Sequence, residues 1–311
     1  MSPEAILRTG RLIKTFDLTH SLGAQHLLIL KTGTIFLTAV VKGDMLIFAP
    51  LCLLLCWKIP VDSMRIHFDF SLRDANQDIP LSMVEDSVDD MYFGCNEAMM
   101  KMVSQKYSGE MYMEPFSRVW REAKVCAEKK QIHKGDEALT TAHLEAICVY
   151  TSDQLYKMFN DAVRTNRSVY GSSFEFHSLH FLLTSAIQIL NNYYCHTAYR
   201  RTSVRFSGQV NQRVRFGSFT SSSYNTDLTD FGSETCFKIK TCTGAFLKDY
   251  STFGDAEAEV LIPPYEVFNI TQKIEDQQKI QDLGVKSCKL MYILESTGCV
   301  SNLNCKAVRS E

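Results

Sequence analysis

The hydrophobic pattern of the chain changes its period at about residue 196, and this change restricts the fold more than any other feature. Before that point, apolar residues recur at helical spacing, for example at Met91, Cys95 and Met99. After it, segments such as 236–241 alternate between polar and apolar residues, which is typical of strands with one buried face. Helices followed by strands, rather than alternating with them, indicate an α+β fold.

The individual elements can be placed approximately. Helices are expected at residues 114–129, 139–164 and 175–192. Segments 257–262 and 290–294 are rich in strand-forming residues. His177 and His180 lie three residues apart on the last expected helix, and the prediction for both is a structural role in the core.

The N-terminal region carries an apolar run of thirteen uncharged residues, 45–57. A membrane-spanning helix needs about 20 residues, so the run fits the core of a secretory signal peptide better, with a cleavage site near residues 61–63. The alternative for the run is an uncleaved buried helix or an anchor. Since the run begins at Met45, residues 1–44 are interpreted as a wrongly extended start. The expected organisation is an extension and signal peptide at 1–63 and one domain at 64–311, mainly helical to 195 and mainly strands from 196.

The cysteines support export. Nine of the eleven follow the apolar run, and disulfides persist in the oxidising environment outside the cell. Because nine is odd, at least one thiol stays free or pairs between molecules. Asn166 and Asn269 begin glycosylation acceptor sequences, and the C-terminus lacks a hydrophobic tail. We therefore expect a secreted protein without a stable membrane span in the mature chain.

Charge and the missing motifs exclude several classes of protein. A net charge of −2 and a pI of about 6.5 do not provide the basic field of a nucleic-acid-binding protein. The sequence has no glycine-rich phosphate loop, no nucleophile-elbow serine and no zinc-binding motif. No nucleic-acid partner and no metal are expected.

A pair of carboxylates remains as a candidate site. Glu257 and Glu259 flank Ala258 in an expected strand, so both side chains would point to one face. Like charges held close together cost energy unless a cation or substrate separates them, which makes the pair a candidate for catalysis. The alternative for an isolated Glu-x-Glu is an exposed polar strand face.

A longer series of motifs decides between these alternatives. In chain order they are Asp89-Asp90-Met91-Tyr92-Phe93-Gly94-Cys95, Leu179-His180-Phe181-Leu182-Leu183-Thr184, Tyr199-Arg200, Phe216-Gly217-Ser218-Phe219-Thr220-Ser221-Ser222-Ser223, Phe231-Gly232 and Glu257-Ala258-Glu259-Val260-Leu261-Ile262-Pro263-Pro264-Tyr265-Glu266. Together they cover residues 80–305 and resemble the vertebrate-type arginine-specific mono-ADP-ribosyltransferases, with their Arg–Ser–Glu-x-Glu signature.

The resemblance implies a fold and a reaction. The fold would be an N-terminal helical subdomain packed on a split mixed β-sandwich of two sheets, with NAD between them. The enzyme would transfer ADP-ribose from NAD or NADP, as co-substrate, to arginine side chains of extracellular or cell-surface proteins and release nicotinamide without a metal. Two alternatives stay open: an NAD glycohydrolase that uses the same site, and a catalytically weak, disulfide-stapled extracellular binding domain.

The resemblance also assigns roles to single residues. Arg200 would bind the NAD diphosphate, and Ser221 would hold the neighbouring catalytic groups in register. Glu259 would bond the nicotinamide ribose and stabilise the cation that forms as nicotinamide leaves. Glu257 would orient and deprotonate the acceptor arginine. Tyr150 resembles an NAD-contacting tyrosine of the family.

Position 201 departs from the family, which usually has glycine there. The resemblance implies that the backbone of this residue contacts the nicotinamide amide, so the Arg201 side chain would narrow the pocket or strain the backbone. Alternatively, its guanidinium is recruited to the NAD phosphates.

The resemblance sorts four of the cysteines. It implies two bridges, Cys95–Cys305 and Cys195–Cys242. Five cysteines are left over, and a Cys288–Cys299 bridge is one option among them; for the rest a buried thiol is the default. The five are Cys126, Cys148, Cys236, Cys288 and Cys299.

Overall fold

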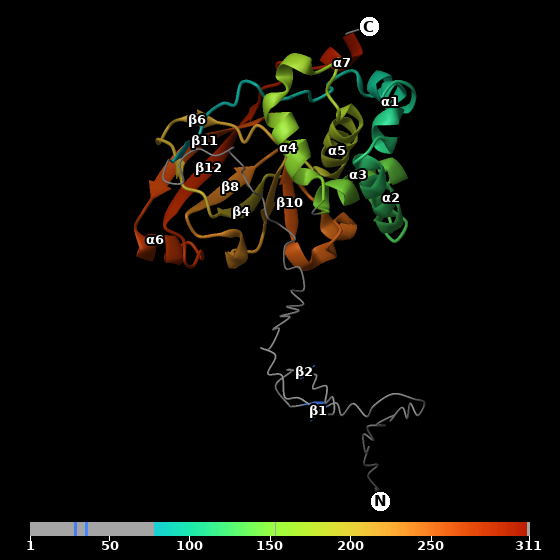
Figure 1. Cartoon of the computed structure of the whole chain (residues 1–311). Helices are drawn as coiled ribbons and strands as arrows, with labels where there is room; N and C mark the ends of the chain where they lie inside the picture. Colours follow the sequence, from blue (N-terminus) through green and yellow to red (C-terminus); the bar gives the residue numbers. More distant parts are fainter. Residues whose placement is uncertain (1–27, 30–34, 37–77, 153, 310–311) are drawn as a thin grey trace, which may run out of the picture. The chain divides into compact units, whose positions relative to one another are not determined.

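The computed structural model describes residues 28–29, 35–36, 78–152 and 154–309 (Figure 1). The chain divides into two units, Met1–Trp57 and Lys58–Glu311. In the first unit, β1 (Leu28–Ile29) pairs antiparallel with β2 (Ile35–Phe36). The predicted signal-peptide core at 45–57 and the cleavage site at 61–63 lie outside the described residues.

The first half of the second unit is helical, as expected. Its helices are α1 (Asn96–Gln105), η1 (Ser108–Tyr112), α2 (Phe116–Ala127), α3 (Thr141–Thr151), α4 (Tyr156–Thr165), η2 (Arg167–Val169) and α5 (His177–Leu190). The single helix expected at 139–164 is wrong, because the backbone turns extended at Ser152 (φ −79°, ψ 151°) and divides it into α3 and α4. At the other end of α3, Thr140 accepts from the backbone N–H of His143 and forms a capping box with it.

Strands dominate the second half and form one eight-stranded mixed sheet in the order β6-β11-β12-β8-β4-β7-β10-β9. Their bounds are β4 (His196–Thr202), β6 (Arg213–Val214), β7 (Thr220–Ser223), β8 (Thr235–Thr241), β9 (Ala245–Phe246), β10 (Glu259–Ile262), β11 (Glu266–Ile274) and β12 (Leu290–Cys299). β3 (Ile79–Pro80) and β5 (Phe206–Ser207) pair separately, and α6 (Gln277–Asp282) and α7 (Lys306–Arg309) complete this half. The α+β class is thereby confirmed.

The expected division into two sheets takes a different form in the structure. All eight strands are joined by hydrogen bonds, but β4 meets β7 through a single residue pair, Tyr199 and Ser223. By contrast, β4 pairs with β8 at seven positions and β7 pairs with β10 at four. The sheet therefore has two halves with a narrow junction between them.

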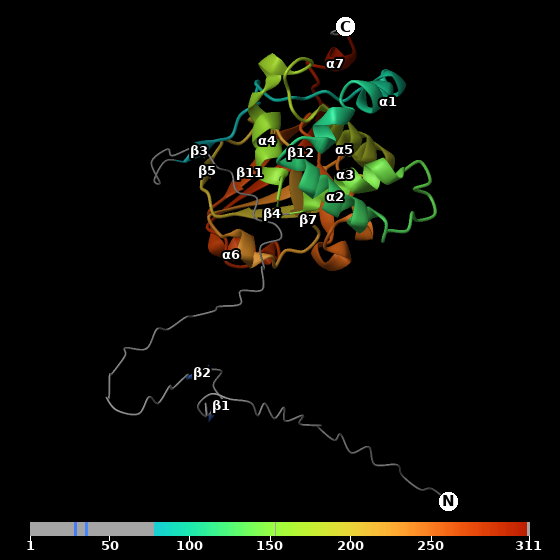
Figure 2. The same cartoon turned by 45° about the vertical axis from the view of Figure 1, so that its right-hand side comes forward.

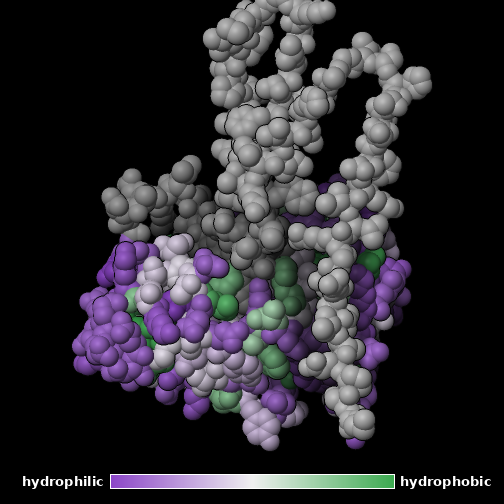
Figure 3. Space-filling model, turned by 90° about the horizontal axis from the view of Figure 1, so that it is seen from below, coloured by the Kyte–Doolittle hydropathy of each residue, from purple (hydrophilic) through white to green (hydrophobic). Residues whose placement is uncertain are grey.

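The helices pack against one half of this sheet. In Figures 1 and 2, α2, α3 and α5 gather on one side and β11 lies on the other. The largest core cluster joins α1–α5 to Phe219, Ala245 and Leu261 around β7, β9 and β10, while a second cluster fills the other half of the sheet around Phe237 and Tyr292. The face seen from below is mainly hydrophilic, with smaller hydrophobic patches (Figure 3).

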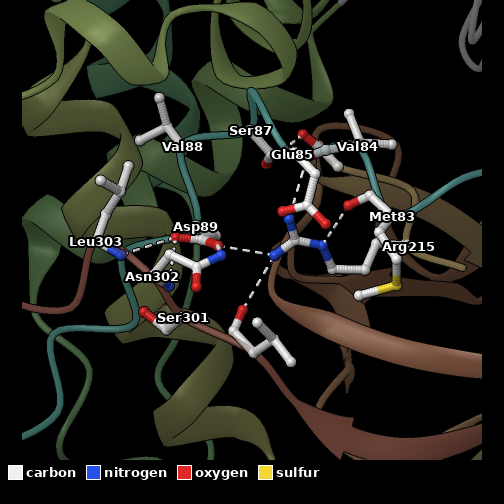
Figure 4. A network of polar contacts seen from close by, with 12 residues as sticks. Met83, Val84, Glu85, Ser87, Val88, Asp89, Arg215, Ser301, Asn302 and Leu303 are labelled. Carbon is white, nitrogen blue, oxygen red and sulfur yellow. Dashed lines mark hydrogen bonds and ion pairs between the residues drawn. The ribbon is translucent and has the colours of Figure 1, made fainter.

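A buried ion pair ties three distant segments together (Figure 4). Arg215 donates from Nη1 to Asp89 Oδ2 (2.7 Å), and both side chains are fully buried. The guanidinium also donates to the carbonyl oxygens of Met83, Val84 and Val300, while Asp89 accepts from the backbone N–H groups of Asn302 and Leu303. Because these bonds compensate both charges, the pair fixes the residues before α1 and those after β12 against the sheet.

A second buried network explains the roles of the two histidines. Tyr170 donates to Asp90 Oδ2 and lies 3.0 Å from the Tyr92 hydroxyl, which contacts His180 Nδ1 at 2.8 Å. His180 Nε2 contacts the Val88 carbonyl, and burial raises the pKa of Asp90 to about 6. His177 contacts Glu110 and accepts from the backbone N–H of Gly171. Both histidines are buried in the core, so the predicted structural role is confirmed.

Candidate active site

The narrow junction of the sheet brings the predicted site residues together. Arg200 lies in β4, Ser221 in β7, and Glu259 is the first residue of β10. A pocket opens at this junction, and its lining residues include Arg200, Arg201, Ser221, Ser223, Asn225, Leu228 and Phe231. Arg200 and Ser221, 21 positions apart in the sequence, thus line one small space, and Glu259 lies on the strand next to that of Ser221.

Glu259 and Ser221 lie on the same face of the sheet. Glu259 pairs with Ser223 and Leu261 pairs with Ser221, so the two side chains are diagonal neighbours on adjacent strands. Burial raises the pKa of Glu259 to about 8; the charge of Glu257 acts in the same direction, and a hydrogen bond with Ser221 opposes it. A cation placed beside this carboxyl would favour its ionised form, so the position suits a group that gains positive charge.

Arg200 is a buried cation. Only 3% of its surface is exposed, and its Nη1 donates to the carbonyl oxygen of Ser221 at 2.8 Å. Burial lowers the pKa of Arg200 to about 9, which leaves the guanidinium charged at neutral pH. A fixed and desolvated guanidinium of this kind suits a diphosphate, because its planar donors match phosphate oxygens.

Tyr150 reaches the same place from α3. Its hydroxyl donates to the carbonyl oxygen of Phe219 (3.0 Å) and accepts from Asn160 Nδ2 (3.2 Å). Burial raises the pKa of Tyr150 to about 12, while hydrogen bonds with Asn160 and Ser221 lower it. Tyr150 therefore joins the helical layer to the entry of β7, and its contact with NAD stays a prediction.

Glu257 does not lie in a strand, which corrects the sequence interpretation. It ends the short helix η5 (Gly254–Glu257), and Ala258 follows in the left-handed region (φ 43°, ψ 50°). The period-two argument fails here because the backbone turns between the two glutamates. Ser223 donates to the Glu257 carbonyl (2.5 Å), and the Tyr224 N–H donates to that of Ala258. The two carboxyl groups still lie close enough for the Glu257 charge to raise the pKa of Glu259.

Arg201 does not have the strained backbone that the sequence comparison with glycine implied. It lies in β4, and its φ is not positive. Its guanidinium donates from Nε to the Thr226 carbonyl (3.0 Å) and from Nη2 to the Lys286 carbonyl (2.7 Å). Arg201 thus braces the loop after β7, so recruitment of its guanidinium to phosphates is disfavoured. A contact between its backbone and NAD stays a prediction.

One basic residue near the site was not predicted from the sequence. Arg164 donates to Ser218 Oγ (2.9 Å) and to Asp161 (3.0 Å), and its charge lowers the pKa of Arg200. Tyr156 raises the pKa of Arg200, and Asn160 donates a hydrogen bond to the Tyr150 hydroxyl. Tyr156, Asn160 and Arg164 are spaced by four residues, which places them on one face of α4. This stripe of polar residues on one helix face is the sequence pattern from which Arg164 could have been predicted.

The structure contains both bridges that the resemblance implies, Cys95–Cys305 and Cys195–Cys242. Two more bridges join leftover cysteines, Cys126–Cys148 and Cys236–Cys288. The suggested Cys288–Cys299 pair is therefore wrong, as is the default of buried thiols for Cys126, Cys148 and Cys236. Cys299 is an exposed free thiol.

The fold and the arrangement of the site define a class of protein, and the comparisons agree with it. The model of the NAD:arginine ADP-ribosyltransferase family matches residues 81–288. The chain belongs to this family, so the resemblance drawn from the sequence motifs is confirmed.

Particular relatives show how far the likeness extends. The chain is 32% identical over 257 residues to the erythroblast NAD(P)(+)–arginine ADP-ribosyltransferase of Gallus gallus, covering 78% of this chain and 80% of the relative. It is 34% identical over 254 residues to ecto-ADP-ribosyltransferase 5 of Mus musculus, covering 75% and 77%. The solved structure of the eukaryotic mono-ADP-ribosyltransferase ART2.2 in complex with NADH has a TM-score of 0.60 and 30% identity, covering 73% of this chain and 98% of ART2.2.

Within residues 78–152 and 154–309, no three His, Cys, Asp or Glu side chains gather as metal ligands would. No helix in the described part of the chain has the length and hydrophobicity needed to span a bilayer.

Proposed function

We propose that this protein transfers ADP-ribose from NAD or NADP to arginine side chains of proteins and releases nicotinamide. The observation that carries the proposal is the meeting of a buried guanidinium, Arg200, with the buried carboxyl of Glu259 and the hydroxyl of Ser221 at one sheet junction. Membership of the arginine ADP-ribosyltransferase family and relatives with that activity in their names support it. ART2.2 was solved with NADH and with NAD, which supports a dinucleotide as co-substrate.

Each site residue has a role that its environment supports. Arg200, with Arg164 nearby, holds the diphosphate, and Ser221 fixes the direction of the Glu259 carboxyl. When the bond between ribose and nicotinamide breaks, positive charge develops on the ribose. A preorganised carboxylate at Glu259, which is buried, stabilises that charge.

Glu257 acts on the second substrate. A guanidinium has a pKa above 12 and is a poor nucleophile until a base removes a proton. Glu257 is 9% exposed and lies at the end of a turn whose preceding residues, Asp255 and Ala256, are exposed, next to Glu259 but outside the sheet; an arginine side chain would reach it through this turn. The guanidine nitrogen then bonds to the ribose carbon as its proton passes to Glu257.

We further propose that the protein works outside the cell on arginine-bearing extracellular or cell-surface proteins. Four disulfides in the described residues support an oxidising compartment, and relatives from Mus musculus carry names with the prefix ecto. Sequencing the N-terminus of the protein recovered from culture medium tests this setting. A chain that starts near residue 64 is expected, whereas retention of an intact chain in the cytosol would contradict it.

One experiment separates transfer from its alternatives. The purified protein is incubated with NAD labelled in the adenylate, with and without agmatine as an arginine mimic. Label on agmatine is expected; free ADP-ribose alone would indicate the glycohydrolase, and intact NAD would indicate a binding domain. Glu257→Gln should lose transfer and keep most NAD cleavage, because only the acceptor step uses this carboxylate. Equal loss of both activities would refute the division of roles.

A further inference from the structure

The loop that carries Glu257 is attached to the helical layer at its base. This Glu257 loop, residues 247–258, connects β9 to β10 and includes the short helices η4 (Lys248–Tyr250) and η5. We propose that Asp136, in the connection between α2 and α3, is a positioning residue for the acceptor step. It acts by clamping the base of this loop, and the inference rests on the proposed role of Glu257.

The Asp136 carboxylate binds two residues of the loop at once. Lys248 donates from Nζ to both carboxylate oxygens, at 2.8 and 2.6 Å, and the Tyr250 hydroxyl donates to Oδ2 at 2.8 Å. The Asp136 side chain is 8% exposed, whereas that of Lys248 is 33% exposed. The carboxylate is therefore shielded from water, and its charge-assisted bonds are stronger than those of an exposed pair.

Neighbouring residues of the same connection strengthen the attachment. Lys130 donates from Nζ to the carbonyl oxygens of Asp249 and Ser251, both at 2.6 Å. The backbone N–H of His133 donates to the Tyr250 hydroxyl at 2.7 Å. The hydroxyl of Tyr250 thus accepts one bond and donates another, and the base of the loop is fixed on several sides.

The backbone at the clamp has a conformation that needs such support. Lys248 has a φ of 54°, in the left-handed region that non-glycine residues seldom adopt. Residues held in such conformations persist where surrounding contacts fix them, and they cluster at functional sites. The ion pair to Asp136 is a contact made by this same residue, so losing it should release the loop at a strained position.

The two glutamates depend on the clamp to different degrees. Glu259 lies in β10, paired with Ser223 on one side, and its carbonyl accepts from the Leu247 N–H on the other. Glu257 lies outside the sheet, at the end of the turn that the clamp supports. Loosening the base of the loop should therefore displace Glu257 while Glu259 stays in place, so transfer should suffer more than NAD cleavage.

The test measures the ratio of transfer to agmatine over NAD hydrolysis in the secreted protein. Asp136→Asn keeps the shape of the side chain but removes its charge, and we expect the ratio to fall about tenfold, equivalent to about 1.4 kcal/mol. Tyr250→Phe removes only the hydroxyl and should lower the ratio by a smaller factor. If Asp136→Asn does not fold, Tyr250→Phe decides the question.

A matched control separates positioning from stability. Asp276→Ala removes the N-cap of α6, where Asp276 accepts from the backbone N–H groups of Gln278 and Lys279, and it does not touch the loop. This control should leave the ratio unchanged. An unchanged ratio in folded Asp136→Asn, or an equal loss of both activities, would overturn the clamp and leave the proposed function intact. A wild-type protein without transfer would reject the proposed function, and the clamp with it.

Discussion

The pKa of Glu259 predicts how the rate of NAD hydrolysis depends on pH. Burial places this pKa at about 8, so in the free protein only about 1% of Glu259 is ionised at pH 6 and about 9% at pH 7. If the carboxylate form stabilises the ribosyl cation, kcat/KM for NAD hydrolysis should rise about tenfold between these two pH values. An ordinary glutamate, with a pKa of about 4.5, would give a flat profile over this range.

Two neighbours of Glu259 should move this profile in opposite directions. The Glu257 charge raises the pKa, so Glu257→Gln should shift the midpoint to lower pH; the Ser221 hydrogen bond lowers it, so Ser221→Ala should shift the midpoint to higher pH. Glu259→Gln should abolish the pH dependence and reduce the rate by about 10²–10³-fold.

The measurement is an initial rate of NAD hydrolysis well below KM, without agmatine. Under these conditions the profile reports ionisations of the free enzyme. A flat profile between pH 6 and 7.5 would show that Glu259 is already ionised and that burial does not control it. Near-normal hydrolysis in Glu259→Gln would remove this residue from the mechanism.

Three further predictions concern Arg201 beside the site and two residues elsewhere in the domain, Asp90 and Cys299. Arg201→Gly should weaken NAD binding and lower the melting temperature, because it removes one bond to the loop after β7 and one to the connection between α6 and β12; a rise in kcat/KM for NAD would show that glycine is the better residue there. Burial raises the folded-state pKa of Asp90 to about 6 from its ordinary value of 3.8, so the unfolding free energy should fall by about 3 kcal/mol as the pH rises from about 4 to above 6; Asp90→Asn should flatten this change in denaturant titrations, and equal slopes would refute it. Alkylation of the unreduced, denatured protein, followed by peptide mapping, should label Cys299 alone among the described cysteines, and label on Cys236 or Cys288 would contradict their bridge.

Most of the site residues could be predicted because they stand in motifs made of neighbouring residues. The order of Arg200, Ser221 and the Glu257–Glu259 pair along the chain was enough to propose a shared pocket, since each stands in a recognisable local motif. Period-two reasoning failed at Glu257, because alternation of residue types does not reveal a left-handed residue such as Ala258.

Contacts between residues that are far apart in the sequence could not be predicted. The pairing of Cys236 with Cys288 depends on the parallel register of β8 and β12, which no local pattern specifies. Asp136 and Lys248 are 112 positions apart, and neither stands in a motif. The two bonds of the Arg201 side chain also depend on backbone carbonyls of distant segments, so a comparison at one position could not reveal them.

The buried pair of Asp89 and Arg215 has a consequence for the order in which the molecule can form during synthesis. Asp89 leaves the ribosome early, and Arg215 follows 126 residues later, but two of the backbone donors of Asp89 come from Asn302 and Leu303. Until these late residues emerge, the Asp89 carboxylate cannot be buried with all its bonds, and an incompletely compensated charge opposes closure of the core. The helical layer can therefore complete its packing only after residues 300–305 have been synthesised. Until then the nascent domain exposes apolar surface and depends on its cellular environment to prevent association of that surface.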